Sequence, residues 1–233
     1  RRALGVVPQD LAVYGELSAV ENLRFFGALY GIRGPALEQN VDWALDLAGL
    51  RDRATEPVSR FSGGLKRRLN LSVGLIHRPK VLILDEPTVG VDPQSRKHIF
   101  DEVRTLANEH EMAVLYTSHY MEEVQALCER IAIVDHGRVL ADGPVASLMK
   151  EHGRTTIEIH FAGQPSELSQ LSEHFEVLEL EESHVRVALP SSVSSLIRTI
   201  ENAGLEVTSI ETQNADLESV FLELTGHSLR DES

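Results

Sequence analysis

The chain has 233 residues, of which 42% are hydrophobic and 25% are charged, a composition typical of a globular protein with room for one large or two modest domains. No stretch approaches the roughly 20 consecutive apolar residues that a membrane-spanning helix requires. The single cysteine, Cys128, excludes an internal disulfide and fits a reducing compartment.

The formal net charge of −14 is unevenly distributed along the chain. Residues 1–150 contain 18 Lys and Arg against 20 Asp and Glu, whereas residues 151–233 contain 4 against 16. This contrast predicts two units with different roles. The acidic second unit is a poor candidate for binding nucleic acid or an anionic lipid surface, because both repel a negative protein.

The first part of the chain reads as a short strand followed by helices. Leu4–Val7 is apolar, and Pro8, Gln9 and Asp10 interrupt it. Ser18 and Glu21 have the spacing of a capping box, which predicts a helix that ends near Gly31. A second amphipathic helix is predicted to reach about residue 47, and residues 51–60 are predicted to form a loop.

A serine and two glycines precede the next predicted helix. Ser62, Gly63 and Gly64 lie before an apolar stripe at helical spacing. The free backbone amides of such a helix start, with the serine hydroxyl beside them, can bind an anion. The simpler interpretation of this stretch alone is an ordinary serine cap, and the basic residues 66–68 fit a solvated face.

Residues 81–88 (Val-Leu-Ile-Leu-Asp-Glu-Pro-Thr) contain the most informative strand. Four apolar residues in a row predict a strand buried on both faces, and Pro87 ends it. Asp85 and Glu86 are therefore expected at the carboxyl end of a central strand, where open α/β sheets bind ligands. One carboxylate can bind Mg²⁺ and its neighbour can polarise an attacking water, although a plain polar loop is the competing interpretation.

Asp92 follows in a tight loop, Val89-Gly90-Val91-Asp92-Pro93, before another amphipathic helix. Residues 112–116 predict a further buried strand, which places His119 at a strand end comparable to that of Asp85. A single histidine in such a place is more often structural than functional. A hairpin around residues 131–141 and a short helix then close the first unit, with a linker at residues 152–153.

The remaining residues predict a second unit built differently. Apolar and polar residues alternate at residues 157–161 and 185–189, which indicates half-buried strands. A helix over residues 165–173, a hairpin at residues 175–189, a helix from residue 192, a strand around residues 207–210 and a helix from residue 216 complete a β-α-β-β-α-β-α order. This order resembles ferredoxin-like modules.

Five stretches occur in the order found in the nucleotide-binding subunits of ATP-binding cassette (ABC) transporters, which residues 1–150 closely resemble. Residues 6–9 resemble the Q-loop, residues 61–65 the signature sequence, residues 81–88 the Walker B strand, residues 89–93 the D-loop, and Ser118-His119 the switch histidine. The Ser-Gly-Gly-Leu-Lys-Arg-Arg variant and residues 217–226 are similar to exporters of the daunorubicin and multidrug-resistance type.

The resemblance implies a role for each matching residue. Asp85 and Gln9 would contribute to an Mg²⁺ site, with Gln9 also sensing nucleotide. Glu86 would be the general base and His119 would contact the γ-phosphate of ATP.

The remaining matches imply a dimer. Ser62, Gly63 and Gly64 would bind the ATP held by a second copy of the subunit, and Asp92 would belong to the loop that connects the two sites. Closing of the dimer over ATP would drive a membrane permease of the ABC-2 type at the cytoplasmic face of the plasma membrane.

The family's phosphate-binding loop, Gly-x-x-x-x-Gly-Lys-Ser/Thr, does not occur in this sequence. We therefore expect a chain truncated at its amino terminus that binds and hydrolyses ATP poorly alone. A non-catalytic binding or regulatory remnant of an ABC ATPase is the alternative. DNA-repair and chromosome ATPases share the head domain, but their long heptad arms are absent here.

The expected fold is thus α/β. A P-loop NTPase-like ABC ATPase core would occupy residues 1–150, without its Walker A part, and would include a helical signature subdomain at about residues 15–77. A small α+β accessory domain would occupy residues 154–227.

Overall fold

The computed structural model describes residues 3–109, 111–163, 171–181 and 183–225. The chain forms two compact units, Arg1–Leu127 and Cys128–Ser233. This division falls earlier in the chain than the linker expected at residues 152–153. No helix within the described ranges is long and apolar enough to cross a membrane.

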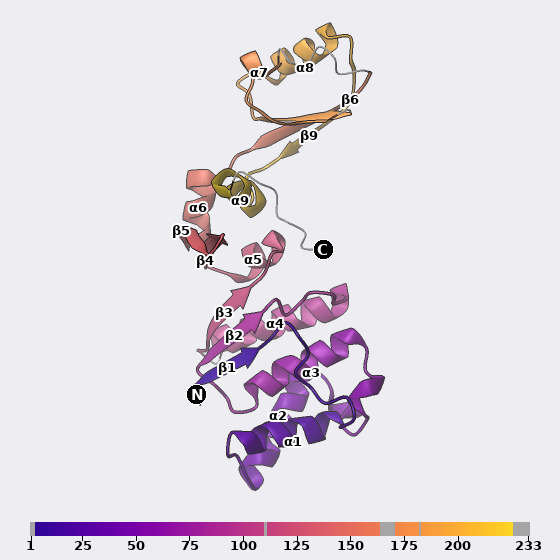
Figure 1. Ribbon diagram of the computed structural model, residues 1–233, viewed down its shortest axis with the longest axis vertical. Coiled ribbons are helices and arrows are strands. Elements are labelled where there is room, and N and C mark those ends of the chain that lie inside the picture. Colours follow the sequence, from indigo (N-terminus) through magenta and orange to yellow (C-terminus); the bar gives the residue numbers. More distant parts are fainter. Residues whose placement is uncertain (1–2, 110, 164–170, 182, 226–233) are drawn as a thin grey trace. The chain divides into compact units, whose positions relative to one another are not determined.

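A three-stranded parallel sheet lies along one side of the first unit (Figure 1). Its strands are β1 (Leu4–Val7), β2 (Val81–Asp85) and β3 (Ala113–Thr117), with β2 in the middle. Val7 lies opposite Leu84, and Asp85 lies opposite Thr117. The carboxyl ends of all three strands therefore meet at one edge, which confirms the expected position of β2.

The prediction that β2 and β3 are buried on both faces is wrong. Leu82 and Leu84 of β2 are fully buried, but Val81 is 38% exposed and Leu115 of β3 is 57% exposed. The physical reason is that the helices of this unit cover only one face of the three-stranded sheet (Figure 1).

The α-helices of the first unit lie on that covered face, except for the last one, which follows the carboxyl end of β3 (Figure 1). They are α1 (Ala19–Leu29), α2 (Pro35–Ala48), α3 (Gly63–Leu75), α4 (Pro93–Glu109) and α5 (Met121–Leu127). The predicted capping box of α1 is present, with the side chains of Ser18 and Glu21 each accepting a backbone N–H. The expected loop at residues 51–60 instead contains two short 3₁₀ helices, η1 (Arg51–Arg53) and η2 (Val58–Arg60).

Helix α3 packs directly on β1 because both elements carry a glycine at the contact. A Cβ atom at Gly5 would lie 2.5 Å from the Gly74 carbonyl oxygen, and one at Gly74 would lie 2.5 Å from Val7 Cγ2. No larger residue fits at either position without moving the backbone. The backbones of β1 and α3 are therefore in close contact, which fixes the position of the strand before Gln9 relative to the helix that follows Ser62.

The second unit begins with a hairpin of β4 (Arg130–Asp135) and β5 (Arg138–Pro144), as expected from the sequence. Its turn holds His136 and Gly137 at positive φ. Helices α6 (Val145–His152) and α9 (Leu217–Thr225) contribute to a small core with this hairpin, centred on Ile133, Leu148 and Val220.

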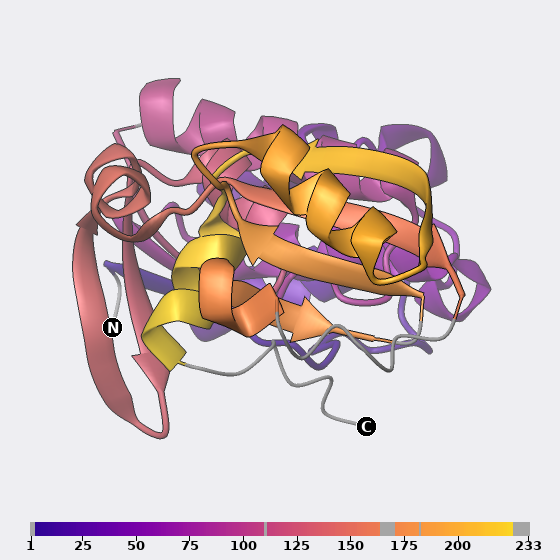
Figure 2. The same ribbon diagram turned by 90° about the horizontal axis from the view of Figure 1, so that it is seen from above.

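A four-stranded antiparallel sheet forms the rest of the second unit. Its strands, in spatial order, are β7 (Val177–Leu180), β8 (His184–Ala188), β6 (Thr156–Ala162) and β9 (Glu206–Gln213). Helices α7 (Leu171–His174) and α8 (Val193–Asn202) lie over one face (Figure 2). This arrangement agrees with the ferredoxin-like expectation. Most of the helix predicted at residues 165–173 lies outside the described residues.

Candidate active site

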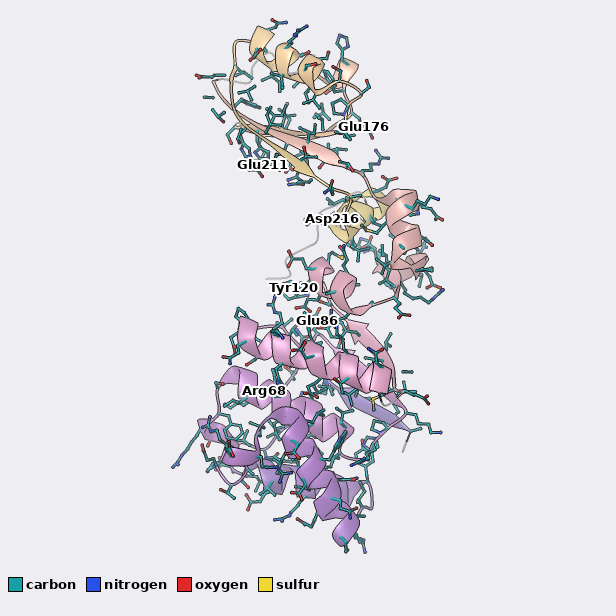
Figure 3. All side chains as sticks on the ribbon, turned by 180° about the vertical axis from the view of Figure 1, so that it is seen from behind. Arg68, Glu86, Tyr120, Glu176, Glu211 and Asp216 are labelled. Carbon is teal, nitrogen blue, oxygen red and sulfur yellow. The ribbon has the colours of Figure 1, made fainter. Side chains whose placement is uncertain are left out.

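The edge of the parallel sheet brings together side chains from three separate parts of the sequence. Gln9 follows β1, Asp85 ends β2, Glu86 comes directly after it, and His119 follows β3. Figure 3 shows Glu86 at this edge next to Tyr120, with Arg68 farther away among the helices. The His119 ring lies against the Tyr120 ring, with 4.2 Å between their centroids.

The carboxylate of Glu86 lies between two partners. Gln9 Nε2 donates to Glu86 Oε2 at 3.0 Å, and His119 Nδ1 lies 3.0 Å from Glu86 Oε1. The Glu86 side chain remains 27% exposed and that of His119 43% exposed, so solvent still reaches both groups. The structure therefore joins three of the residues predicted from the sequence in one hydrogen-bonded cluster.

The backbone of Glu86 adopts an unusual conformation that aims its side chain into this cluster. Its φ is +43°, in the left-handed region that non-glycine residues rarely occupy. Such a conformation costs about 1–3 kcal/mol and persists only when neighbouring contacts fix it. Here Thr117 Oγ1 accepts the Glu86 N–H at 3.1 Å and donates to Asp85 Oδ1 at 2.7 Å.

Asp85 and Gln9 fit the chemistry of a magnesium site. Asp85 is exposed and uses one carboxylate oxygen to accept from Thr117, which leaves the other available. The amide nitrogen of Gln9 donates to Glu86, so its amide oxygen is the group that can face a cation. Mg²⁺ prefers oxygen ligands of this kind.

The Ser62–Gly64 stretch begins α3 as predicted. Ser62 Oγ accepts the N–H of Leu65 at 3.4 Å, so this serine is a helix cap, and its exposed position also leaves the helix start open to an anion. Gly64 packs closely on the start of α4. A Cβ atom there would lie 2.0 Å from Ser95 Oγ and 2.6 Å from Asp92 Oδ1.

Asp92 caps α4 and faces a cavity beside the start of α3. Its carboxylate accepts the Ser95 N–H at 2.9 Å, and this hydrogen bond lowers the pKa of Asp92. The cavity has a volume of about 510 Å³ and is also lined by Ser62 and Arg68. Burial lowers the pKa of Arg68, whereas the carboxylate of Asp92 opposes that shift.

The predicted residues thus fall into two groups within the first unit. Among the hydrogen bonds of the described residues, none joins Ser62, Gly63 or Gly64 to Glu86 or His119. Arg67 instead connects α3 with the other group, because its guanidinium donates to the carbonyl oxygens of Gln9 and Val89. The interpretation of residues 66–68 as a solvated face is therefore wrong for Arg67. Burial also lowers the Arg67 pKa.

Glu123 is a buried residue of this region that the sequence does not distinguish. Its side chain is 2% exposed, and its carboxylate accepts from Thr88 Oγ1 at 2.7 Å, the Tyr116 hydroxyl at 2.8 Å and Ser118 Oγ at 3.1 Å. Arg96 Nε of α4 lies 3.5 Å from it. Glu123 therefore links the segments that follow β2 and β3 with α4. In the sequence it is one of two consecutive glutamates on an amphipathic helix, a pattern typical of a solvated surface.

Comparison with known families gives two matches. Residues 1–89 match the ABC transporter family, and residues 143–225 match the family described as ATP-binding protein DrrA1-3-like, C-terminal domain. Together they cover much of both units described above.

Similar proteins extend over nearly the whole chain. The linearmycin resistance ATP-binding protein LnrL of Bacillus subtilis (strain 168) is 39% identical over 241 residues, which cover 99% of this chain and 77% of LnrL. The daunorubicin resistance ATP-binding protein DrrA3 of Streptomyces coeruleorubidus is 33% identical, with 99% and 74% covered. Nod factor export ATP-binding protein I of Sinorhizobium fredii (strain NBRC 101917 / NGR234) is 37% identical, with 99% and 66% covered.

Solved structures agree in fold. The CbiO1 protein of Clostridium perfringens, part of the ABC transporter complex CbiONQ, has a TM-score of 0.58 at 27% identity and covers 65% of this chain and 61% of its own. A dimeric ATP-binding cassette, MJ0796, bound to ADP and Pi has a TM-score of 0.55 at 23% identity, with 62% and 64% covered, and supports the fold alone. The chain spans just under two thirds of these two structures.

The parallel sheet, the polar edge and these comparisons define a nucleotide-binding α/β protein. The chain belongs to the ATP-binding subunits of ABC transporters, and its relatives are subunits that serve resistance and export. Its second unit carries the DrrA-like C-terminal domain.

Proposed function

We propose that this chain is the motor part of an ABC exporter that couples ATP hydrolysis to transport through an ABC-2 permease. Residues 1–150 would form the ATPase domain and residues 154–227 an accessory domain. The observation that carries the proposal is the Glu86 carboxylate, which lies between Gln9 and His119 at the carboxyl edge of a parallel sheet. The resistance and export relatives support the exporter class.

In this proposal Glu86 accepts a proton from the water that attacks the γ-phosphorus of ATP. The new bond joins the water oxygen to phosphorus, and the bond from phosphorus to the β–γ bridging oxygen breaks. Both Glu86 oxygens have partners in the structure, so one partner must be replaced by the water before the proton can transfer. His119 presents Nδ1 to Glu86, and its Nε2 is the atom proposed to face the γ-phosphate.

Asp85 and Gln9 are the residues proposed to hold Mg²⁺, which when bound would neutralise charge on the β- and γ-phosphates. Thr117 fixes the Asp85 carboxylate at 2.7 Å. Ser62, Gly63 and Gly64 would bind the γ-phosphate of ATP in a second copy, with Asp92 in the connecting loop. The active assembly would therefore be a homodimer on the cytoplasmic face of the inner membrane.

The test is to express the intact gene product together with an ABC-2 permease encoded beside its gene. We expect the two proteins to copurify from membranes and to release phosphate from ATP only when Mg²⁺ is present. Copurification without phosphate release would support the regulatory alternative. A gene product that neither binds the permease nor hydrolyses ATP would refute the proposal.

A further inference from the structure

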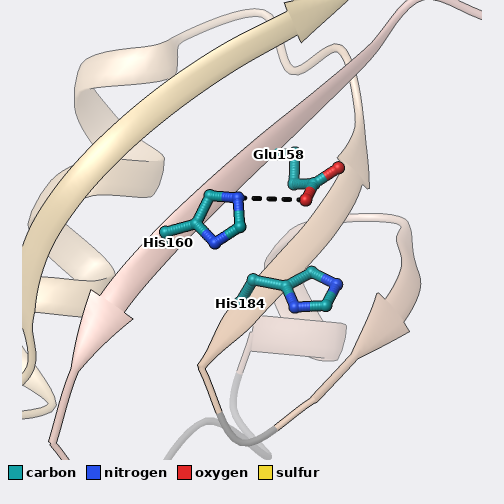
Figure 4. Close-up of side chains that lie close together, drawn as sticks. All are labelled: Glu158, His160 and His184. Atoms are coloured by element: carbon teal, nitrogen blue, oxygen red, sulfur yellow. Dashed lines mark ion pairs between the residues drawn. The ribbon is translucent and has the colours of Figure 1, made fainter.

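The second unit carries a cluster of imidazole and carboxylate groups on the sheet face opposite α7 and α8 (Figure 4). Strand β6 alternates between the two faces, so Ile157 and Ile159 enter the core whereas Glu158 and His160 lie on the other side. Strand β8 alternates in the same way. Because β6 and β8 are antiparallel with His160 directly opposite His184, the backbone itself places these two imidazoles side by side.

The three potential ligands of this cluster are close enough to share one ion. The ligand atoms of Glu158, His160 and His184 all lie within 4.8 Å of one another. His160 Nε2 is 3.1 Å from Glu158 Oε1, and the two imidazole centroids are 5.3 Å apart. Two atoms bound to one tetrahedral Zn²⁺ at 2.0–2.1 Å are separated by about 3.3 Å, so small side-chain rotations would complete the set.

The surroundings of Glu158 orient its carboxylate. Arg186 Nη2 lies 3.3 Å and Gln213 Nε2 lies 3.1 Å from Glu158 Oε2, which leaves Oε1 directed at His160. The Glu158 side chain is only 12% exposed and that of His184 only 15% exposed. A ligand set that is half-buried and held by neighbouring hydrogen bonds loses little conformational freedom when an ion binds.

The charge of the neighbourhood also favours a cation. Glu181 Oε2 lies 3.7 Å from His184 Nδ1, and Glu179 pairs with Arg186 at 3.1 Å. With neutral imidazoles, Glu158, Glu179 and Glu181 give three negative charges against the single positive charge of Arg186. Glu179 and Glu181 also form a second potential ligand group with His184.

We propose that His160, His184 and Glu158 bind a divalent transition-metal ion of the zinc class in the C-terminal domain. Two nitrogen donors and one carboxylate select zinc-like ions over Mg²⁺ or Ca²⁺, which prefer sites made of oxygen alone. The ion would link the adjacent strands β6 and β8. The site is separate from the ATP-site residues proposed in the first unit and does not depend on the proposed ATPase activity.

The experiment is a titration of the full metal-stripped chain with Zn²⁺ against a competing chelator, in the presence of excess Mg²⁺. We expect one tightly bound Zn²⁺ per chain. Removal of a residue that only orients a metal ligand weakens binding by 10- to 100-fold, so His160→Ala and His184→Ala should each weaken it by about 100-fold or more. His174→Ala is the matched control, because this exposed histidine lies in the same unit outside the cluster, and it should bind as the unaltered chain does.

A second measurement uses the unaltered chain, so its result does not depend on whether the variants fold. Zn²⁺ should shift the imidazole ¹⁵N signals of His160 and His184 in NMR spectra, and EDTA should reverse the shift. The proposal is overturned if these two signals do not respond to Zn²⁺. Equal affinity in folded His160→Ala, His184→Ala and His174→Ala chains would also overturn it.

Discussion

His119 Nδ1 lies 3.0 Å from Glu86 Oε1, although the two residues belong to segments that follow different strands. The parallel register of β2 and β3 brings them together. With Gln9 on the second oxygen, the carboxylate is held in a resting arrangement that a bound triphosphate and water would have to change.

Glu86→Gln retains the size of the side chain but removes the group that can accept a proton. In the intact gene product bound to its permease, we expect phosphate release to fall by about 100- to 10,000-fold, the contribution typical of general acid–base catalysis. ATP binding should persist, as measured with a fluorescent nucleotide. The control is Glu122→Gln, since Glu122 is exposed on α5. Undiminished turnover in Glu86→Gln would exclude this residue as the base.

Glu123→Ala should destabilise the first unit, because it removes a buried carboxylate and leaves the hydroxyls of Thr88 and Tyr116 and the nearby Arg96 without it. We expect the free energy of unfolding to fall by about 1–3 kcal/mol, the cost of leaving buried hydrogen-bonding groups without a partner. Urea unfolding followed by Trp43 fluorescence measures this, because Trp43 is the single tryptophan of the chain.

The neighbouring Glu122→Ala is the control for that experiment. This exposed side chain should change the unfolding free energy by no more than about 0.5 kcal/mol. Equal effects of the two substitutions would contradict a structural role specific to the buried glutamate.

Gly64→Ala should disturb the start of α3, whereas Gly63→Ala should not. A methyl group at Gly64 would meet the buried Ser95 hydroxyl and the Asp92 carboxylate, while one at Gly63 has no atom within 4 Å. We expect a loss of about 1–3 kcal/mol at Gly64, as for other overpacked sites. At Gly63 a stabilisation of up to about 1 kcal/mol is expected from helix propensity. Urea unfolding of both variants measures these free energies. A Gly64→Ala chain as stable as the Gly63→Ala chain would contradict the described packing.

Acid should destabilise the first unit through two partly buried histidines. Burial lowers the pKa of His98 and of His77, although each imidazole donates a hydrogen bond to a backbone carbonyl oxygen, that of Leu47 and that of Leu4 respectively. Below the ordinary histidine pKa of about 6.5 the unfolded chain binds protons that the folded chain resists. The unfolding free energy should therefore fall as the pH drops below about 6.5, and it should be nearly independent of these groups above that value.

Trp43 fluorescence in urea at several pH values provides the measurement. The double variant His77→Gln/His98→Gln should show a flatter pH dependence than the unaltered chain. His174→Gln in the second unit should leave the slope of the first unit unchanged. If the unfolding free energy of the double variant depends on pH as steeply as that of the unaltered chain, other groups cause the pH dependence.

Most helices and strands were predictable because caps, glycines and hydrophobic periodicity determine local structure within a few residues. The capping box of Ser18 and Glu21 and the glycine-flanked helix at residue 63 lie where the sequence places them. The exposure of Leu115 was not predictable, because an apolar strand reads the same whether one or both of its faces are covered. Which face is covered depends on contacts distant in the sequence.

The sequence predicted those residues of the candidate site that lie at or just after the end of a strand. Gln9, Glu86 and His119 each follow an apolar run, so their meeting follows from a parallel sheet. Glu123 carries no such signal, because burial of a carboxylate depends on donors from three other segments. Arg67 likewise looks like any basic residue on a helix until its guanidinium is seen at the Gln9 carbonyl oxygen.

The contact between Gly5 and Gly74 has a mechanical consequence. Close-packed backbone has low compressibility, so we expect a displacement of β1 to be transmitted to α3 through this contact. Gln9 lies two residues after the end of β1, so movement of Gln9 would be coupled through this contact to the helix that begins at Gly63.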